Sequence, residues 1–97
     1  MFFKKIIKMM MSNSNTEEYL NNGAILLDVR TEAEFSDGHH PKSVNIPLQV
    51  LKSRLNELDN QKAIVTVCRS GARSGQAAII LREKGFDTIN GGPWNLI

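Results

Sequence analysis

Residues 63–85, AIVTVCRSGARSGQAAIILREKG, give the clearest indication of the fold. The segment opens with AIVTV (63–67), a β-branched apolar run with the length and composition of a buried strand. It closes with SGQAAIILREK (74–84), a segment rich in Ala, Ile and Leu that predicts a helix ending at Gly85. Between the two lies CRSGAR (68–73), which holds the only cysteine of the chain. A buried strand that passes through a short loop into a helix is typical of an α/β fold.

The remaining chain continues this alternation of strands and helices. AILLDV (24–29) is a second uninterrupted apolar run, and such strands are typically buried on both faces of a parallel sheet. Ser14 is the expected cap of a helix that Gly23 stops, and Thr31 with Glu34 predicts a capping box for a helix over 31–35. Short strands are expected over 43–47 and 86–90. A helix over 48–58 carries leucines at helical spacing, namely Leu48, Leu51, Leu55 and Leu58. We therefore predict an α/β fold with a central parallel β-sheet flanked by helices.

Length, charge and cysteine content exclude several classes of protein. With 97 residues the chain suits one compact domain, which we place over 14–97. The net charge of +2 and the scattered basic residues do not indicate a nucleic-acid partner. A single cysteine cannot form an internal disulfide, and neither His39 nor His40 has zinc-motif spacing with Cys68. We expect a reducing compartment, no metal and no cofactor.

The first thirteen residues, MFFKKIIKMMMSN, resemble the beginning of a targeting segment. Lys8 interrupts the apolar stretch, so the uninterrupted run of about 7–15 apolar residues typical of a signal peptide is missing. We interpret residues 1–13 as a leader or a first strand, predict no membrane association, and place the protein in the cytoplasm. A degenerate signal would place it in the periplasm instead.

Polar and reactive residues follow the two clearest strands. Asp28 and Arg30 come at the end of the first strand, and Cys68 comes directly after the second. The carboxyl ends of parallel strands share one edge of a sheet, and open α/β folds bind their ligands at that edge. We therefore expect these residues at the same edge of the sheet.

The surroundings of Cys68 favour a thiolate over the free thiol, whose ordinary pKa is about 8.5. Arg69 and Arg73 add positive charge nearby, and the N-terminus of the following helix attracts an anion. The small residues of the loop let backbone N–H groups converge as in an anion-binding nest. These residues are Ser70, Gly71, Ala72 and Ser74. The loop suits an anionic nucleophile that attacks an anionic substrate, although a buried cysteine acting as a small hydrophobe is the alternative.

The length of the loop distinguishes two chemistries. A cysteine phosphatase holds phosphate with five residues between its cysteine and its arginine, whereas here Arg73 comes one position earlier and Ser74 stands in its place. A tighter loop should hold a single sulfur atom bonded to Cys68 better than a tetrahedral oxyanion. The spacing therefore favours sulfur transfer.

With these motifs the sequence resembles the rhodanese-like sulfurtransferase family, specifically its stand-alone single-domain members. The resemblance covers about residues 15–92 through LLDVRTEAEF, GHH…VNIP, VTVCRSGARS and GF…INGG, in the family's order and spacing. It implies a central parallel sheet flanked by helices, with the cysteine loop at its carboxyl edge.

The resemblance also implies a mechanism and a role for each matching residue. Cys68 is then the nucleophile that takes the outer sulfur of thiosulfate, releases sulfite and passes the sulfur to an acceptor such as cyanide. The backbone N–H groups of residues 69–73 would cradle the persulfide, Arg69 would draw in the anionic donor, and Arg73 would hold the loop.

Residues outside the loop are assigned supporting roles. Asp28 and Arg30 match the DVR element, where a structural ion pair is favoured over a catalytic base. His39 is expected to pack the loop, with proton donation as the alternative. Gly91 and Gly92 match a turn that lets the backbone approach the active loop. His40, Lys42 and Ser43 depart from the family pattern, and Trp94 is expected to cover the site or cap the core.

Two other functions stay open at this point. A persulfide carrier or interaction module would deliver the Cys68 sulfur to a protein partner, and a small domain with a shallow site does not exclude such an acceptor. A phosphatase or arsenate reductase is the third hypothesis. The spacing from Cys68 to Arg73 argues against it.

Overall fold

The computed structural model describes residues 14–97, so the predicted leader or first strand over 1–13 lies outside the described residues. Its elements, in chain order, are α2 (Ser14–Asn21), β1 (Ile25–Asp28), α3 (Glu32–Asp37), β2 (Val44–Asn45), the 3-10 segment η1 (Leu48–Glu57), β3 (Ile64–Cys68), α4 (Ala72–Glu83), β4 (Thr88–Pro93) and the 3-10 turn η2 (Trp94–Leu96). The strands form one sheet in the order β2-β1-β3-β4, and each neighbouring pair is parallel. The predicted parallel sheet with helices is confirmed.

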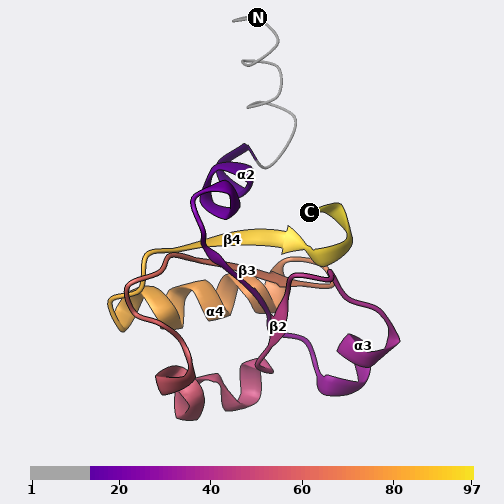
Figure 1. Cartoon of the computed structure of the whole chain (residues 1–97). Helices are drawn as coiled ribbons and strands as arrows, with labels where there is room; N and C mark the ends of the chain where they lie inside the picture. The colour runs from indigo at the N-terminus through magenta and orange to yellow at the C-terminus, as the bar shows by residue number, and fades with distance from the viewer. Residues whose placement is uncertain (1–13) are drawn as a thin grey trace, which may run out of the picture.

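Helices cover both faces of this sheet, as the apolar runs predicted. Figure 1 shows α2 on one side of the strands and α4 with η1 on the other. Alternate strand residues supply the two cores. Leu27 and Ile64 pack with Leu51 and Leu81 of η1 and α4, whereas Leu26, Val65 and Val67 pack on the α2 side. Cys68 belongs to the core beneath α4 and η1.

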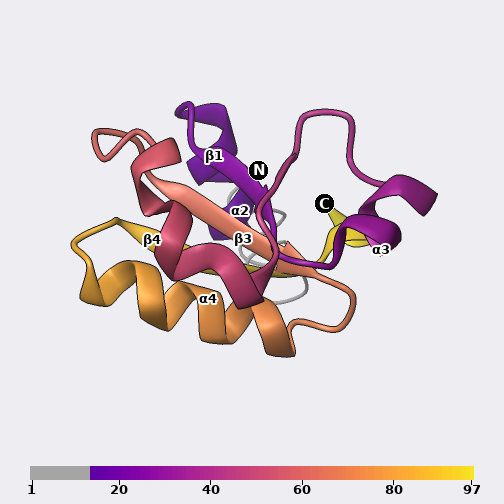
Figure 2. The ribbon, with the colours of Figure 1, turned by 90° about the horizontal axis from the view of Figure 1, so that it is seen from below.

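All four strands point toward α3 and the C-terminal turn. Seen from below, α4 runs beneath β3 and β4, and α3 lies beyond the carboxyl ends of the strands (Figure 2). The edge that we expected to hold the site is therefore bordered by α3, by the turn that enters α4, and by η2. No helix among residues 14–97 is long and apolar enough to cross a membrane.

Most of the predicted helix signals are confirmed. Thr31 and Glu34 form the capping box of α3, with Thr31 N–H donating to Glu34 Oε1 at 3.0 Å and Glu34 N–H to Thr31 Oγ1 at 3.2 Å. Gly23 and Gly85 follow α2 and α4 with φ of 92° and 90°, the left-handed conformation that stops a helix. The side chain of Ser14, the predicted cap of α2, lies outside the described residues.

The helix predicted over 48–58 forms with a different geometry. It is a 3-10 segment interrupted at Arg54, whose φ and ψ are −121° and 17°. The predicted leucine face is correct, since Leu51 and Leu58 are buried and Leu48 and Leu55 pack against them. Three-residue steps between these leucines suit the three residues per turn of a 3-10 helix, and the single four-residue step contains Arg54.

The predicted turn at Gly91 and Gly92 is wrong, because β4 runs through both residues to Pro93. Thr66 pairs with Asn90 and Val67 with Gly92, so Gly91 is the extra residue of a β-bulge. A Cβ on Gly91 would lie 2.6 Å from Val65 Cγ1, which explains a glycine there. The expected approach to the loop is present, since a Cβ on Gly71 would lie 3.5 Å from Gly92 Cα.

Candidate active site

Cys68 is the last residue of β3 and is fully buried, so it begins the loop from within the strand. Its Sγ accepts a hydrogen bond from Gly71 N–H at 3.0 Å and lies 3.3 Å from Ser74 Oγ. The sulfur is therefore surrounded by hydrogen-bonding groups despite its burial, which is unlike a cysteine that serves only as a small hydrophobe.

The loop between Cys68 and α4 is shorter than predicted. The helix begins at Ala72, two residues before the expected start, so Ala72 and Arg73 belong to its first turn. Gly71 caps the helix with φ of 104°, a conformation that is easy only for glycine. This conformation accompanies the Gly71 N–H bond to Cys68, while Ala72 N–H bonds Ser70 Oγ at 3.4 Å instead. The structure thus brings only part of the expected N–H cradle to the sulfur.

Hydrogen bonds control the charge of Cys68. Burial raises the pKa of the thiol, but the Ser74 hydroxyl and the backbone N–H groups of Ser74, Gly71 and Ser70 outweigh it and leave the pKa below its ordinary value. The sequence had assigned part of this effect to the two arginines. The structure gives the larger part to Ser74, which the sequence analysis names only as a small residue of the loop and in the argument on loop length.

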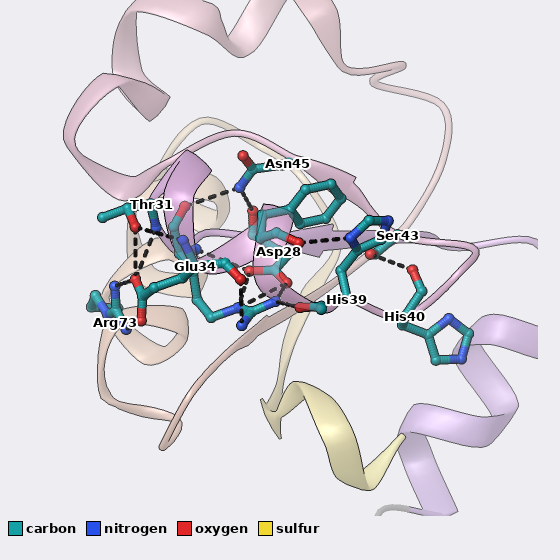
Figure 3. A network of polar contacts seen from close by, with 11 residues as sticks. Asp28, Thr31, Glu34, His39, His40, Ser43, Asn45 and Arg73 are labelled. Atoms are coloured by element: carbon teal, nitrogen blue, oxygen red, sulfur yellow. Dashed lines mark hydrogen bonds and ion pairs between the residues drawn. The ribbon is translucent and has the colours of Figure 1, made fainter.

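The side chain of Arg73 forms an ion pair with a residue of α3. Its Nη1 and Nη2 donate to Glu34 Oε1 and Oε2 at 2.7 and 2.9 Å, which ties the start of α4 to α3 (Figure 3). Hydrogen bonding to Arg73 is the main reason that the pKa of Glu34 falls to about 2. The predicted anchoring contact of Arg73 is present, and its partner is a carboxylate that we had assigned only to a helix cap.

Asp28 and Arg30 form a buried ion pair at the end of β1. Arg30 Nη2 donates to Asp28 Oδ2 at 2.7 Å and to Gly38 O at 2.8 Å, and Nε bonds both carboxylate oxygens at 3.0 Å. The guanidinium also lies 4.5 Å from the centre of the Trp94 ring. Asn45 Nδ2 donates to the carbonyls of Asp28 and Arg30, as Figure 3 shows for Asp28. These contacts fit the structural ion pair that we favoured.

His39 follows α3, which ends at Asp37, and its ring contacts Phe35 rather than the loop of Cys68. Its ring stacks on the ring of Phe35 with the two ring centres 3.7 Å apart, and its Nδ1 lies 2.7 Å from Phe35 O. His40 orders the next turn, because its carbonyl accepts from Ser43 Oγ at 2.7 Å and its Nδ1 accepts from Lys42 N–H at 3.1 Å. These contacts match the loop-packing interpretation of His39 and give the unusual His40 and Ser43 a structural use.

An open pocket of about 430 Å³ lies beside the loop. Arg69 is exposed and lines it, together with Arg30, Glu34, Asp37, Trp94 and Asn95. A larger pocket of about 520 Å³ lies near Leu58 and Phe86, which precede β3 and β4. Because that pocket is at the amino ends of the strands, the smaller one is the better candidate for a ligand. Within residues 14–97 no group of three His, Cys, Asp or Glu side chains is arranged to hold a metal ion.

Asn90 is the residue at this edge that sequence reasoning missed. Its Oδ1 accepts from Ser74 Oγ–H at 2.7 Å and from Gly92 N–H at 3.0 Å, and its Nδ2 donates to Gly71 O at 3.0 Å. The signal was present, since Asn90 ends the predicted strand over 86–90 and so had to lie at the carboxyl edge.

Comparison with known proteins agrees with this geometry. The model of the rhodanese-like domain family matches residues 12–92. A sulfurtransferase of Allochromatium vinosum is 35% identical over 65 residues, covering 67% of this chain and 61% of the relative. The thiosulfate sulfurtransferase GlpE of Pseudomonas syringae is 36% identical over 67 residues, covering 69% and 63%. The chain thus spans less than two thirds of the length of these curated relatives.

A solved structure shares the fold. The rhodanese with anions from E. coli superposes with a TM-score of 0.71 at 31% identity, over 77% of this chain and 92% of that one. The family model covers most of the chain, including β1, the cysteine loop and the start of β4. The chain belongs to the rhodanese-like domain family.

Proposed function

We propose that the protein moves a sulfane sulfur from thiosulfate, or a similar anionic donor, to a thiophilic acceptor through a persulfide on Cys68. The observation that carries the proposal is the bonding of the sulfur. Cys68 Sγ is buried at the end of a strand, yet it lies 3.0 Å from a donating N–H of Gly71 and 3.3 Å from the Ser74 hydroxyl. Such donors stabilise a thiolate, which is the reactive form of cysteine.

The sulfur moves in two displacements. The Cys68 thiolate attacks the outer sulfur of thiosulfate, a new S–S bond forms, and the old S–S bond breaks with its electron pair leaving on sulfite. The acceptor then attacks the outer sulfur of the persulfide, and Cys68 leaves as a thiolate. Cys68 is buried and is followed directly by the exposed Arg69 and Ser70, so the donor approaches from the side of the loop on which these two residues lie.

The surrounding residues divide the remaining tasks. Arg69, exposed at the pocket, attracts the anionic donor. Arg73 holds the first turn of α4 through Glu34, and Gly71 supplies the N–H that faces the sulfur. Asp28 and Arg30 support the edge from β1, and His39 supports α3. The chemistry needs no base once the thiolate has formed, which agrees with the commitment of Asp28 to Arg30.

A persulfide carrier that serves a protein thiol is the second candidate. The openness of the pocket favours it, because Arg69, Asp37 and Asn95 line the pocket and are all exposed, so that a large acceptor has access. The exposed free thiols of a partner are suitable acceptors in a reducing compartment such as the cytoplasm, where we place the protein.

Intact-protein mass spectrometry tests the proposal directly. Incubation with thiosulfate should add one sulfur, about 32 Da, which cyanide removes. Because Cys68 is the only cysteine, Cys68→Ser should show no adduct. An adduct that persists in Cys68→Ser, or the absence of any adduct, would overturn the proposal. Slow discharge to cyanide with fast discharge to a protein thiol would favour the carrier.

A further inference from the structure

Asn90 is held in one orientation by two backbone groups of the loop and the bulge. Its Nδ2 donates to Gly71 O at 3.0 Å, and its Oδ1 accepts from Gly92 N–H at 3.0 Å. Since one group needs a donor and the other an acceptor, the amide cannot be reversed without losing both bonds. Gly75 leaves room for it, because a Cβ there would lie 3.2 Å from Nδ2. The carbonyl end of Asn90 therefore faces Ser74.

Ser74 lies between this carbonyl and the sulfur of Cys68. The side chain is fully buried, with Oγ 2.7 Å from Asn90 Oδ1 and 3.3 Å from Cys68 Sγ. A hydroxyl has one proton to donate, and Asn90 Oδ1 has none. While the proton points to Asn90, Ser74 presents a lone pair to the sulfur. That arrangement suits a thiol, which donates its S–H, and opposes a thiolate.

We propose that the Ser74 hydroxyl turns from Asn90 Oδ1 to Cys68 Sγ when Cys68 becomes a thiolate, so that Asn90 is a positioning residue that competes with the nucleophile for a single proton. In the thiol state the chain of donation runs from Cys68 to Ser74 to Asn90. In the thiolate state Ser74 donates to Cys68, and Asn90 Oδ1 keeps only the bond from Gly92. Asn90 thereby favours the uncharged forms of the sulfur.

The meaning of this switch for catalysis rests on the proposed function. In a persulfide the charge lies on the outer sulfur, and the inner Sγ of Cys68 is uncharged. The Ser74 proton is then free to return to Asn90, which stabilises the loaded state. When an acceptor removes the outer sulfur, Sγ becomes a thiolate and Ser74 turns back to it. The competition of Asn90 and Cys68 for the Ser74 proton thus stabilises the persulfide before transfer and the thiolate after it.

The charged groups around Cys68 do not obscure this effect. Arg73 of α4 is within electrostatic reach of Cys68 and Asp28, and it is paired with Glu34 of α3. The pKa of Glu34 is about 2, so this pair keeps its charges at every pH at which a thiol is alkylated. Asp28 of β1 is paired with Arg30, and β4 places the uncharged Pro93 beside Cys68.

The pH dependence of alkylation measures the charge of Cys68 without any sulfur donor. The rate of modification by iodoacetamide, followed by intact mass and divided by its high-pH plateau, reports the thiolate fraction and corrects for altered access. At a pH below the midpoint of the thiol-to-thiolate titration of Cys68, Ser74→Ala should lower this ratio about tenfold, because a donor to the charged sulfur is lost. Asn90→Ala should raise it about threefold, because a competing acceptor is lost. Asn56→Ala, an exposed asparagine in η1, is the matched control and should leave the profile unchanged.

The double variant decides whether Asn90 acts through Ser74. In the Ser74→Ala background, Asn90→Ala should have no effect on the midpoint. If Asn90 only anchored Gly71, Asn90→Ala would move the midpoint of the alkylation profile up and not down. The Gly71 N–H would then be less well placed and would stabilise the thiolate less. An upward shift in Asn90→Ala, or an equal shift in both backgrounds, would overturn the proposal.

A second substitution covers the case in which Asn90→Ala does not fold. Asn90→Asp keeps an oxygen that accepts from Ser74 and adds a negative charge, so it should move the midpoint of the alkylation profile up. The upward shift should be larger in the protein that retains Ser74 than in the Ser74→Ala background. Equal shifts in the two backgrounds would contradict the switch. These profiles need no thiosulfate. If the thiosulfate adduct fails to form while the predicted shifts appear, only the proposed function is wrong, and the reverse pattern rejects only the switch.

Discussion

Two neighbouring strands end at the same edge of the sheet in very different ways. β1 ends in Asp28, whose buried carboxylate is matched by the guanidinium of Arg30. β3 ends in Cys68, whose buried sulfur is contacted by the Gly71 N–H and the Ser74 hydroxyl. At the end of β1 the two opposite charges neutralise each other, and the ion pair supports the fold. At the end of β3 the hydrogen-bonding groups face Cys68 Sγ, which is charged only as a thiolate. Groups whose charge is adjusted in this way are typical of reactive sites.

Removal of the reactive atom should have the largest effect on function. Cys68→Ser should reduce thiosulfate–cyanide turnover to the uncatalysed background, because a serine hydroxyl is not ionised at neutral pH and does not form a persulfide. Sulfite release from thiosulfate measures it. Residual turnover above the background would place the sulfur carrier on another group and remove the contrast between the two strand ends.

Breaking the ion pair at the end of β1 should instead destabilise the fold. Asp28→Asn leaves the buried Arg30 charge without its partner, and we expect a loss of about 3–5 kcal/mol in the free energy of unfolding by urea. The exposed Arg54–Glu57 pair is the comparison, and Arg54→Ala should lower the free energy of unfolding far less than Asp28→Asn does, because water screens an exposed pair. Equal losses at the two pairs would contradict the structural role of Asp28.

The bridge between α3 and α4 should make stability depend on acid. The folded-state pKa of Glu34 is about 2, below the ordinary value of 4.5, so its contribution is present above about pH 4.5 and is lost as the pH falls toward 2. Both side chains are about one third exposed, so water screens the pair and about 1 kcal/mol is expected. Urea unfolding at several pH values should show this loss in the wild type and not in Glu34→Gln. An unchanged acid profile in the variant would exclude the bridge as its source.

The smallest effect should come from the exposed arginine of the loop. Arg69→Ala should lower kcat/KM for thiosulfate about three- to tenfold at low salt and flatten its dependence on ionic strength, because Arg69 attracts the donor across solvent. Lys52→Ala removes an exposed positive charge from η1 and is the control. If the two variants behave alike, Arg69 contributes only net charge and has no specific place at the site.

Several features of the fold were predictable because their signals are local. The apolar runs before Asp28 and Cys68 indicate buried parallel strands, and the capping box of Thr31 and Glu34 is complete within four residues. The 3-10 geometry of η1 was not predictable, since a leucine stripe with steps of three and four residues fits either helix type. The bulge at Gly91 was missed because its cause, the close approach of Val65, belongs to another strand.

The candidate site shows the same division. The amino-acid pattern was enough to place Cys68, the proposed nucleophile, and the loop with Gly71 at the carboxyl edge of the sheet, because a buried strand that leads into a helix is a local signal. The hydrogen-bond partners of the loop residues became clear from the packing of the elements. Arg73 meets Glu34, 39 residues away in the chain, and Ser74 meets Asn90 across 16 residues. A hydrogen bond forms only at a distance of about 3 Å, and the packing of α3, α4 and β4, which no local pattern encodes, sets these distances.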